Sequence, residues 1–580
     1  MLRRGQRVFI FIGILLSALN IFITWKSCVT SSEFSNAQQS QQTHVDVILE
    51  QLQLQQNEYK AVLHLADDVI SRLKREAATT TTTSHTRLST STETIPTTTE
   101  TQRPASHNLA QDPYIRKLLN DAHELQLTFR ARFGSPSNES DPNYYVQWMI
   151  DQQNALINNI EEFRDQNLEA RGEAARKLQD LVQKRINYLQ NPKDCRSNRK
   201  LVCAIHKKCG FGCQLHHLSY CMMTAYGTGR TMILVSKLWL YNPGGWEEIF
   251  EPLSATCTQT FNFKPQVWRG ELESANELEV MLPAVDQLPK APRFAPLGIP
   301  EDLADELDQF HGSPGVWWVG QFIKYIFRPR PWLRKELDGY EVTVDYSTPI
   351  VGVHVRRTDK IGKEASFHAI DEYMKHVDDW FDRYDQQRNS QQQEPTRRRV
   401  YLATDDPTLL PIAKAKFPHY TFVSFVHFSR TAGSLFHRYS TDSLRGVIAD
   451  IHLLSKCNYL VCTFSSQVCR VAYELMQTLH PDASNYFHSL DDVYYCGGQT
   501  AHEQTAVLDH APKPGSQEIE LRIGDVVVLS GNHWDGYSKG TNRRTKKTGL
   551  YPSYKVNEKI PLLKYPTYPE ADSYKGEGNT

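Results

Sequence analysis

Two adjacent arginines and a lysine follow an apolar segment in the sequence HVRRTDK, at residues 354–360. The preceding segment, residues 349–355 (PIVGVHV), is rich in β-branched residues and predicts a buried strand. Guanidinium forks bind phosphate oxygens through paired hydrogen bonds and stay charged in a partly dry site. The spacing therefore predicts a phosphate site at the end of a strand, with a solvated run of charges as the alternative. Glu364, one short loop further on, is a candidate general base.

Two other stretches place polar side chains where predicted strands end. Residues 403–407 (ATDDP) carry paired carboxylates that could bind a metal, orient a sugar or a ribose, or cap the following turn. Residues 462–467 (CTFSSQ) predict the end of a strand, a Ser-Ser turn and the start of a helix. A helix N-terminus offers N–H groups and a positive dipole end to an anion. N-capping by serine is the alternative for this turn.

The motifs that are missing narrow the kind of site. The sequence contains neither a Walker A pattern nor Gly-x-Gly-x-x-Gly, which argues against a P-loop kinase or sulfotransferase and against a typical dinucleotide dehydrogenase. No compelling Asp-x-Asp metal motif ends a strand, and the pairs 378–379 and 491–492 are predicted to lie on the surface. The three stretches together predict a nucleotide diphosphate whose charge is neutralised by protein cations rather than by a metal.

These side chains must be positioned by an α/β body. Short apolar runs predict strands at residues 231–235, 349–355, 399–403, 420–425 and 458–463. Amphipathic stretches at residues 443–455 and 466–479 predict helices between or after them. Such alternation predicts a mostly parallel, doubly wound sheet, in which ligands bind at the carboxyl ends of the strands.

The composition sets outer limits on the protein. A chain of 580 residues is too long for one domain. Its 65 Lys and Arg nearly balance its 66 Asp and Glu, which argues against a nucleic-acid binder held by phosphate electrostatics. A hydrophobic content of 40% allows packed cores.

The N-terminus predicts a membrane anchor. Arg3, Arg4 and Arg7 precede an apolar run at residues 8–25, and a basic flank of this kind keeps the N-terminal end in the cytosol. We expect a retained type II signal-anchor, with the chain from Ser27 onward in an oxidising lumen. A cleaved signal peptide is the alternative.

Two helical regions flank a Thr-rich stretch. Residues 45–73 carry a 3-4 apolar repeat over four heptads, which predicts a coiled coil. Residues 77–104 predict an O-glycosylated stalk, and Asn138 lies in the one glycosylation sequon. The second region, residues 111–190, is interpreted as a dimer seam, with an intramolecular hairpin as the alternative. Its apolar stripe comprises Ile115, Leu118, Ala122, Leu125, Phe129, Leu156, Ile160, Phe163, Leu178, Val182 and Leu189.

The cysteines favour disulfides over a metal site. Six of the 11 lie close together: Cys195, Cys203, Cys209, Cys213, Cys221 and Cys257. Four lie far downstream: Cys457, Cys462, Cys469 and Cys496. In a luminal chain the even cluster indicates a disulfide framework, although spacing alone leaves 15 connectivities for six cysteines. A zinc site built from Cys209, Cys213, His216, His217 and Cys221 is the alternative.

The C-terminal segment resembles a Src-homology-3 barrel. Residues 524–529, 533–537 and 549–554 predict its short strands, in the order Gly-Asp, β run, Trp-x-Gly and Gly-Leu-Tyr-Pro. It begins with QEIEL at residues 517–521 instead of the common ALYDY, and a basic loop at residues 543–547 replaces an acidic one. We therefore expect a structural or acceptor-contacting domain rather than one that captures Pro-rich peptides.

From about residue 112 to its end, the chain resembles the animal α-1,6-fucosyltransferases of N-glycans. The matching motifs are CGFGCQLHH (209–217), HVRRTDK (354–360), ATDDP (403–407), SLRGVIADIH (443–452), TFSSQVCRVAYE (463–474) and GNHWDGYSKG (531–540). The resemblance implies a single-pass type II protein of the Golgi membrane that forms a homodimer. It also implies transfer of L-fucose from GDP-β-L-fucose to O6 of the innermost, Asn-linked GlcNAc, with inversion and without a divalent metal or other cofactor.

The resemblance also implies a domain order. An open α/β region and a GT-B-like Rossmann domain would stand between the N-terminal helices and the Src-homology-3-like barrel. The boundaries that follow are 1–7 cytosolic tail, 8–25 anchor, 26–110 stem, 111–190 helical dimerisation region, 191–345 acceptor-side α/β domain, 346–497 donor-binding Rossmann domain, 498–565 barrel and 566–580 tail.

The roles of the donor-site residues follow from the same resemblance. Arg356 would bind the donor pyrophosphate, with Arg357 beside it and His354 on the same strand. Ser466 and Gln467 would sit at the phosphates.

Other residues would contact the guanine nucleoside, act in catalysis or contact the acceptor glycan. Asp450 would contact the guanine nucleoside and Tyr241 would shape the donor pocket. Glu364 would take the proton from O6, aided by Lys207. The residues that would contact the acceptor glycan are Asp286, His533 and Lys539.

The resemblance further implies four disulfides: Cys195–Cys257, Cys203–Cys221, Cys209–Cys213 and Cys462–Cys469. One departure is visible, since Phe211 stands where vertebrate members have tyrosine, so no hydrogen bond from that hydroxyl is expected. Two other functions compete with the transferase. A membrane-tethered lectin would use the barrel to bind glycans, and a glycoside hydrolase would use Asp405 and Glu364 as facing carboxylates.

Overall fold

The computed structural model describes the helical region and the body of the chain. The described residues are 112–133, 143–165, 168–262, 265–268, 277–284, 294, 298–358, 361, 366–394, 396–425, 438–491, 503–532 and 535–573. The predicted anchor, coiled coil and stalk and the sequon at Asn138 lie outside them. Within the described ranges, no helix combines the length and apolar character that a membrane crossing needs.

The described residues of the region 111–190 are helical, as predicted, and form α3 (Asp112–Phe133), α4 (Asn143–Asp165) and α5 (Leu168–Gln190). Helices α3 and α4 pack on each other through Leu119 and Ala122 from one side and Ile157 from the other. The apolar stripe of α5 is buried in the main core of the same chain. For α5 the prediction of a dimer seam was therefore wrong, because a 3-4 apolar repeat does not reveal which chain supplies the partner surface.

The first α/β region is a parallel four-stranded sheet in the order β2-β1-β4-β3. Its strands are β1 (Lys200–Ala204), β2 (Thr231–Val235), β3 (Gln266–Val267) and β4 (Glu279–Leu282). Helix α6 (Phe211–Gly227) connects β1 to β2 and is buried almost along its whole length. The helices that follow are α7 (Glu301–Phe310), α8 (Pro314–Ile326) and α9 (Pro331–Thr343). Apolar residues of α5, α6, α7 and α8 share one core.

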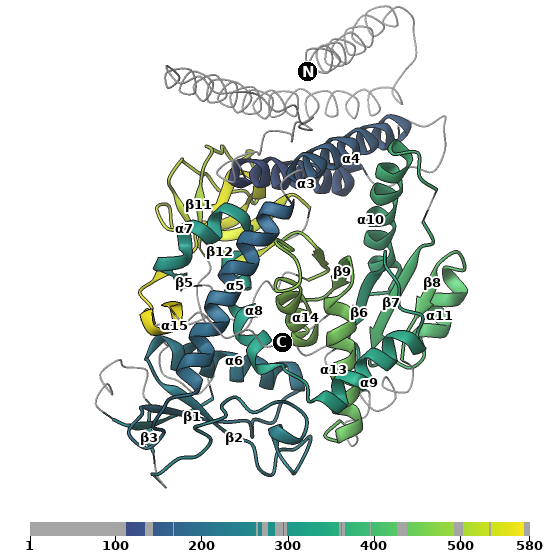
Figure 1. The fold of residues 1–580 in the computed structure, drawn as a ribbon. Helices are drawn as coiled ribbons and strands as arrows, with labels where there is room; N and C mark the ends of the chain where they lie inside the picture. The colour runs from purple at the N-terminus through teal and green to yellow at the C-terminus, as the bar shows by residue number, and fades with distance from the viewer. Residues whose placement is uncertain are drawn as a thin grey trace, which may run out of the picture. The chain divides into compact units, whose positions relative to one another are not determined.

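The second α/β region is the predicted parallel sheet, with five strands in the order β10-β9-β6-β7-β8 (Figure 1). Its strands are β6 (Val351–Val355), β7 (Arg399–Thr404), β8 (Thr421–Val423), β9 (Tyr459–Cys462) and β10 (Phe487–Ser489). Its helices are α10 (Ile370–Ser390), α11 (Leu409–Lys416), α13 (Thr441–Ser455) and α14 (Gln467–Met476). On one side of the sheet β7 and β8 follow β6, and on the other side β10 follows β9. The boundary between β6 and β9 is therefore the topological switch point, where ligands of such sheets bind.

The C-terminal sheet is antiparallel, with the order β14-β13-β12-β11-β15. Its strands are β11 (Glu503–Ala506), β12 (Val526–Asn532), β13 (Tyr537–Asn542), β14 (Thr548–Pro552) and β15 (Val556–Glu558). A separate small core contains Ile519, Val527 and Tyr551. Of the predicted strand 533–537, residues 533–534 lie outside the described residues, and the prediction was wrong for Asp535 and Gly536, since β13 starts only at Tyr537.

The segment that follows this sheet is not a loose tail. Strand β16 (Leu562–Leu563) pairs with β5 (Ile299–Pro300), and α15 (Pro569–Ser573) follows. Tyr565 and Tyr568 are buried in the main core, and Arg185 of α5 binds both carboxylate oxygens of Asp572 at 2.8 and 2.9 Å. For residues 566–573, the prediction of a tail was wrong, because the aromatic residues complete a core whose other members lie mostly between residues 175 and 337.

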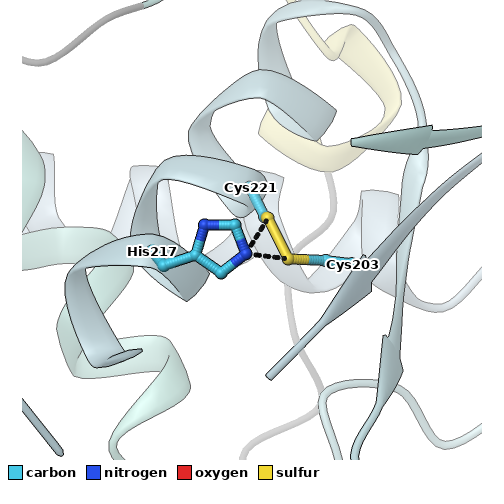
Figure 2. Close-up of side chains that lie close together, drawn as sticks. All are labelled: Cys203, His217 and Cys221. Carbon is cyan, nitrogen blue, oxygen red and sulfur yellow. Dashed lines mark hydrogen bonds between the residues drawn. A yellow bond between two sulfur atoms is a disulfide. The ribbon is translucent and has the colours of Figure 1, made fainter. Parts of the chain in front are cut away.

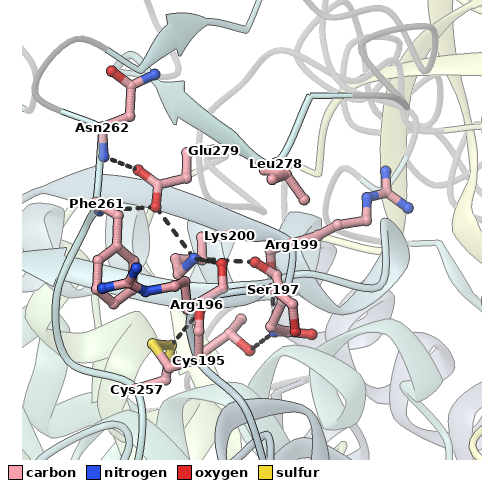
Figure 3. Close-up of polar contacts among 12 residues, drawn as sticks. Cys195, Arg196, Ser197, Arg199, Lys200, Cys257, Phe261, Asn262, Leu278 and Glu279 are labelled. Carbon is pink, nitrogen blue, oxygen red and sulfur yellow. Dashed lines mark hydrogen bonds and ion pairs between the residues drawn. A yellow bond between two sulfur atoms is a disulfide. The ribbon is translucent and has the colours of Figure 1, made fainter.

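All four predicted disulfides are present: Cys195–Cys257, Cys203–Cys221, Cys209–Cys213 and Cys462–Cys469. Cys457 is a buried free thiol. A charged clasp lies beside the first of these disulfides (Figure 3). Lys200 is wholly buried and its Nζ lies 3.2 Å from Glu279, its register partner on β4.

Backbone donors complete the clasp. The N–H groups of Phe261 and Asn262 donate to the Glu279 carboxylate, each at 2.9 Å. Burial by itself would raise the pKa of Glu279, but these hydrogen bonds and Lys200 hold that pKa below its ordinary value. The clasp thereby fixes the segment after Cys257 to the edge of the first sheet.

We expect Lys200→Met to lower the free energy of unfolding by about 3–5 kcal/mol, because it leaves the buried Glu279 carboxylate without its cation. Chemical denaturation followed by tryptophan fluorescence measures the shift in midpoint. The matched control is Lys177→Met, since Lys177 pairs with Glu173 on an exposed helix surface, with 71% of its side chain accessible. That change should cost less than about 1 kcal/mol. Equal shifts in the two variants would contradict the assignment.

Candidate active site at the switch point

The C-terminal ends of β6 and β7 meet at Asp405. This buried carboxylate accepts hydrogen bonds from the N–H groups of Arg357 and Thr358, at 2.8 and 3.0 Å, and it pairs with the Arg356 guanidinium. Asp405 therefore shapes the loop that carries Arg356. Of the alternatives for ATDDP, the cap of the following turn is observed at the second carboxylate, since Asp406 accepts the N–H and the hydroxyl of Thr408 at 2.9 and 2.6 Å.

The two arginines have different surroundings. Arg357 donates to Asp406 and to the carbonyl of His368, both at 3.1 Å, and its guanidinium stacks 4.7 Å from the centre of the Phe367 ring. Its contacts are thus those of a residue that holds the loop after β6. Burial would raise the pKa of Asp406, but hydrogen bonds from Thr408 and the Arg357 charge bring that pKa below its usual value. The Arg356 guanidinium likewise has a carboxylate partner in Asp405, so its contact with a phosphate stays a prediction.

Across the switch point, α14 starts directly after β9. Ser466 precedes the helix, and its side chain makes no capping hydrogen bond, so the N-capping alternative is not observed. The N–H groups of Phe464 and Ser465 instead donate to the carboxylate of Asp491, at 2.9 and 3.0 Å. Asp491, which was predicted to lie on the surface, is partly buried and orders the turn that leads into α14.

The N-terminus of α6 lies against the N-terminus of α14. A Cβ atom at Gly212 would come within 2.9 Å of the Gln467 carbonyl carbon and 3.0 Å of the Val468 nitrogen. Only glycine allows this approach. The Cys209–Cys213 disulfide closes the first turn of α6, and the Cys462–Cys469 disulfide ties α14 to β9. Two helix N-termini are thus held together beside the end of β6.

Tyr241 lies next to this pair of helices. The N–H of Phe211 donates to its hydroxyl at 3.1 Å, and the Tyr439 ring lies edge-on at 5.2 Å. Burial raises the pKa of Tyr241 to about 12, against an opposing effect of the Arg438 and Arg356 charges. Through Phe211, Tyr241 thus lies at the α6 N-terminus, which contacts α14 at Gln467. Tyr241 is therefore a neutral phenol at this site.

Residues 2–495 match the family described as alpha-(1,6)-fucosyltransferase N- and catalytic domains, and residues 506–557 match a variant SH3 domain. The chain belongs to the alpha-(1,6)-fucosyltransferase family. The alpha-(1,6)-fucosyltransferase of Drosophila melanogaster is 47% identical over 440 residues, which are 76% of this chain and 70% of that protein. That of Caenorhabditis elegans is 45% identical over 380 residues, 64% of this chain and 66% of that protein.

Among solved structures, fucosyltransferase NodZ from Bradyrhizobium is 16% identical, with a TM-score of 0.30, and covers 47% of this chain and 92% of its own. NodZ co-crystallised with GDP is 17% identical, with a TM-score of 0.29, and covers 47% and 91%.

In this fucosyltransferase the predicted nucleoside contact, Asp450, faces a tyrosine. The Tyr401 hydroxyl donates to Asp450 Oδ1 at 2.6 Å. Burial raises the pKa of Asp450 to about 7, and the hydrogen bond from Tyr401 partly opposes the shift. The carboxylate therefore titrates near neutral pH, unlike an exposed aspartate.

The structure does not describe every predicted site residue of the fucosyltransferase. Glu364, Asp286 and His533 lie outside the described residues. His354 is buried on β6, and the carbonyl of Lys207 accepts from the Cys209 N–H at 3.0 Å, at the start of α6. Lys207 thus lies on the loop that leads into the α6 N-terminus.

The remaining predicted residue, Lys539, is exposed on β13 of the SH3 domain. The structure therefore brings together Arg356, Tyr241, Ser466 and Gln467, whereas Lys539 belongs to another sheet. Its acceptor role stays a prediction.

The zinc alternative was wrong for this fucosyltransferase. The Nε2 atom of His217 lies 3.4 Å from Cys203 Sγ and 3.8 Å from Cys221 Sγ, as Figure 2 shows, but the two sulfurs are bonded to each other. A disulfide sulfur is not the thiolate that zinc requires. Cys209 and Cys213 form a second disulfide with each other, so they offer zinc no thiolate either.

Sequence reasoning missed several residues around the site, among them Tyr401, Tyr439, Glu474 and Asp491. Glu474 stood in a quoted motif, seven residues after Gln467, a spacing that puts both on one face of a helix. That periodicity was the signal that could have found it.

Proposed function

We propose that this fucosyltransferase transfers L-fucose from GDP-β-L-fucose to O6 of the innermost, Asn-linked GlcNAc of N-glycans, with inversion and without a divalent metal. The observation that carries the proposal is Arg356 at the end of β6, placed across the switch point from the N-terminus of α14. Family membership supports the sugar and the linkage.

The proposed step exchanges one bond at the anomeric carbon for another. The bond from C1 of fucose to O6 of GlcNAc forms, while the bond from C1 to the β-phosphate oxygen breaks and its electron pair leaves with GDP. The O6 proton passes to Glu364, with Lys207 assisting. Arg356 and the N–H groups of the α14 N-terminus offset the charge that grows on the β-phosphate, and fixed donors of this kind need no reorganisation during the reaction.

The acceptor, the assembly and the location are parts of the same proposal. Asp286, His533 and Lys539 contact the glycan. The described disulfides support a luminal location, because such bonds persist in oxidising compartments. Residues 8–25 anchor the protein in the Golgi membrane as a single-pass type II chain. A homodimer would use α3 and α4, where Leu156 is 45% exposed.

One assay tests the activity. The enzyme is incubated with GDP-fucose and a GlcNAc-terminated N-glycopeptide in the presence of EDTA. The mass of the glycopeptide is then measured by mass spectrometry. We expect a mass gain of one deoxyhexose. Glycopeptide binding without transfer would instead support the lectin, and transfer that stops in EDTA would contradict the metal-free reaction.

The Asp450–Tyr401 pair predicts a pH-dependent affinity for GDP. If the Asp450 carboxylate accepts hydrogen bonds from guanine, only its ionised form binds, so affinity rises as the pH rises through about 7. Tyr401→Phe removes a donor to the carboxylate and raises its pKa further, so the midpoint should move to higher pH. Calorimetric titration of GDP between pH 5.5 and 8.5, roughly spanning that pKa, measures it.

The matched control for this prediction is Tyr346→Phe. The Tyr346 hydroxyl donates to the carbonyl of Leu453, at 3.1 Å, in the turn of α13 that follows Asp450. Its removal should leave the midpoint in place. An unchanged midpoint in Tyr401→Phe would contradict the assignment of Asp450 to guanine.

A further inference from the structure

One histidine connects the predicted phosphate site to a buried carboxylate. His216 of α6 lies between two side chains of α14, with its Nδ1 2.8 Å from Gln467 Oε1 and its Nε2 2.8 Å from Glu474 Oε2. His216 is 6% exposed and Glu474 is 2% exposed. Because Gln467 and Glu474 are two helical turns apart, one imidazole ring can contact both.

The partners of the ring define its hydrogen-bonding roles. An ionised carboxylate only accepts hydrogen bonds, so Nε2 donates to Glu474. The Gln467 atom facing Nδ1 is an oxygen, which also accepts, so Nδ1 donates as well. With the amide oriented in this way both ring nitrogens face acceptors, which is the hydrogen-bonding pattern of an imidazolium. Its charge is balanced by Glu474, which explains how both groups are kept in the core.

This arrangement fixes the polarity of the Gln467 side chain. An amide offers an acceptor oxygen on one side and an NH₂ donor on the other. Because His216 contacts the amide oxygen of Gln467, the NH₂ group of that amide faces away from His216. An anion binds to hydrogen-bond donors, so this NH₂ group is the one that suits it. The contact at Gly212, one turn before His216, keeps α6 and α14 too close for the ring to move away.

We propose that His216 is a positioning residue for donor binding. Supported by Glu474, it holds the Gln467 amide so that the NH₂ group faces the phosphates of the nucleotide sugar. This inference rests on the proposed function, which places Gln467 at those phosphates. Without His216, the amide can rotate by half a turn and present its oxygen to the anion.

Substitutions at His216 separate positioning from simple packing. In His216→Gln, the new amide reaches the place of Nε2 and can keep the contact with Glu474, but the contact with Gln467 is lost. In His216→Asn, the shorter amide stays near the place of Nδ1 and can still donate to Gln467. We expect GDP affinity to fall about tenfold in the first variant and to be largely retained in the second. Calorimetric titration of GDP into the full chain measures both.

Substitutions at Gln467 complete the test. Gln467→Glu keeps a partner for the imidazolium but offers the phosphates no donor, so GDP affinity should fall at least about tenfold while the melting temperature is maintained. In the Gln467→Ala background, His216→Gln should have no further effect. The inference would be overturned if the double variant bound GDP more weakly than Gln467→Ala alone. Wild-type affinity of His216→Gln for GDP would overturn it as well.

The result also separates this inference from the proposed function. If Gln467→Ala and Gln467→Glu bind GDP normally while Arg356→Ala does not, the donor site stands and the role of His216 is refuted. If Arg356→Ala also binds GDP normally, the proposed donor site itself is wrong. Should His216→Gln fail to fold, the Gln467 variants decide the question, because Gln467→Glu preserves the buried ion pair.

Discussion

Arg356→Ala is expected to reduce kcat/KM for fucosyl transfer by at least about 150-fold, which corresponds to ~3 kcal/mol of transition-state stabilisation. GDP leaves with extra negative charge on its β-phosphate, and Arg356 is the cation that the end of β6 brings to this place. Asp405 keeps the N–H groups of Arg357 and Thr358 but loses its cation, so some loss of stability is expected beside the loss of activity. Steady-state kinetics with varied GDP-fucose measure the loss.

Arg356→Lys is the matched control, because it keeps the charge and removes the two-pronged donor. Its activity should fall between those of the wild type and the alanine variant. A normal melting temperature for both variants would show that folding is intact. A near wild-type kcat/KM for Arg356→Ala would refute the role in charge stabilisation.

Glu364→Gln should bind GDP with wild-type affinity yet lose about 10²–10⁴ in kcat, because an amide cannot take the O6 proton. Glu364 lies outside the described residues, so this expectation rests on the resemblance and on its position one short loop after Arg356. Single-turnover kinetics separate the chemical step from donor binding.

Glu372→Gln serves as the control for that variant. Its carboxylate lies in the first turn of α10, at the end of the same connection from β6, and accepts the Ala369 N–H at 2.7 Å. Loss of this contact should affect stability slightly and turnover little. Normal fucosylation by Glu364→Gln would mean that another group is the base.

The second sheet and the end of β6 were predictable because buried parallel strands appear in sequence as continuous apolar runs. The runs at residues 349–355 and 399–403 predicted β6 and β7 in this way, and the rule for doubly wound sheets then selected Arg356. The roles of individual side chains were less predictable. Nothing in the local sequence distinguishes Arg356 from Arg357. Only the fold shows that Arg357 donates hydrogen bonds to Asp406 and to the carbonyl of His368.

Long-range pairings set a second limit. His216 and Gln467 are separated by 251 positions, so no periodicity connects them. The apolar stripe of α5 was visible, but its partner surface was not, because hydrophobic spacing is the same for a core and for a dimer. The disulfide pairing came from the family resemblance, since spacing left many connectivities open.

The docking of α15 has a consequence for how the protein is made. Trp318 Nε1 donates to the Tyr565 hydroxyl at 3.2 Å, and the Tyr568 hydroxyl donates to the carbonyl of Tyr226 at 2.7 Å. The core around α6 and α8 therefore remains incomplete until synthesis has passed Asp572. A chain that terminates early would expose aromatic surface deep in its first half. Completion of this core thus depends on synthesis of the residues that lead into and form α15.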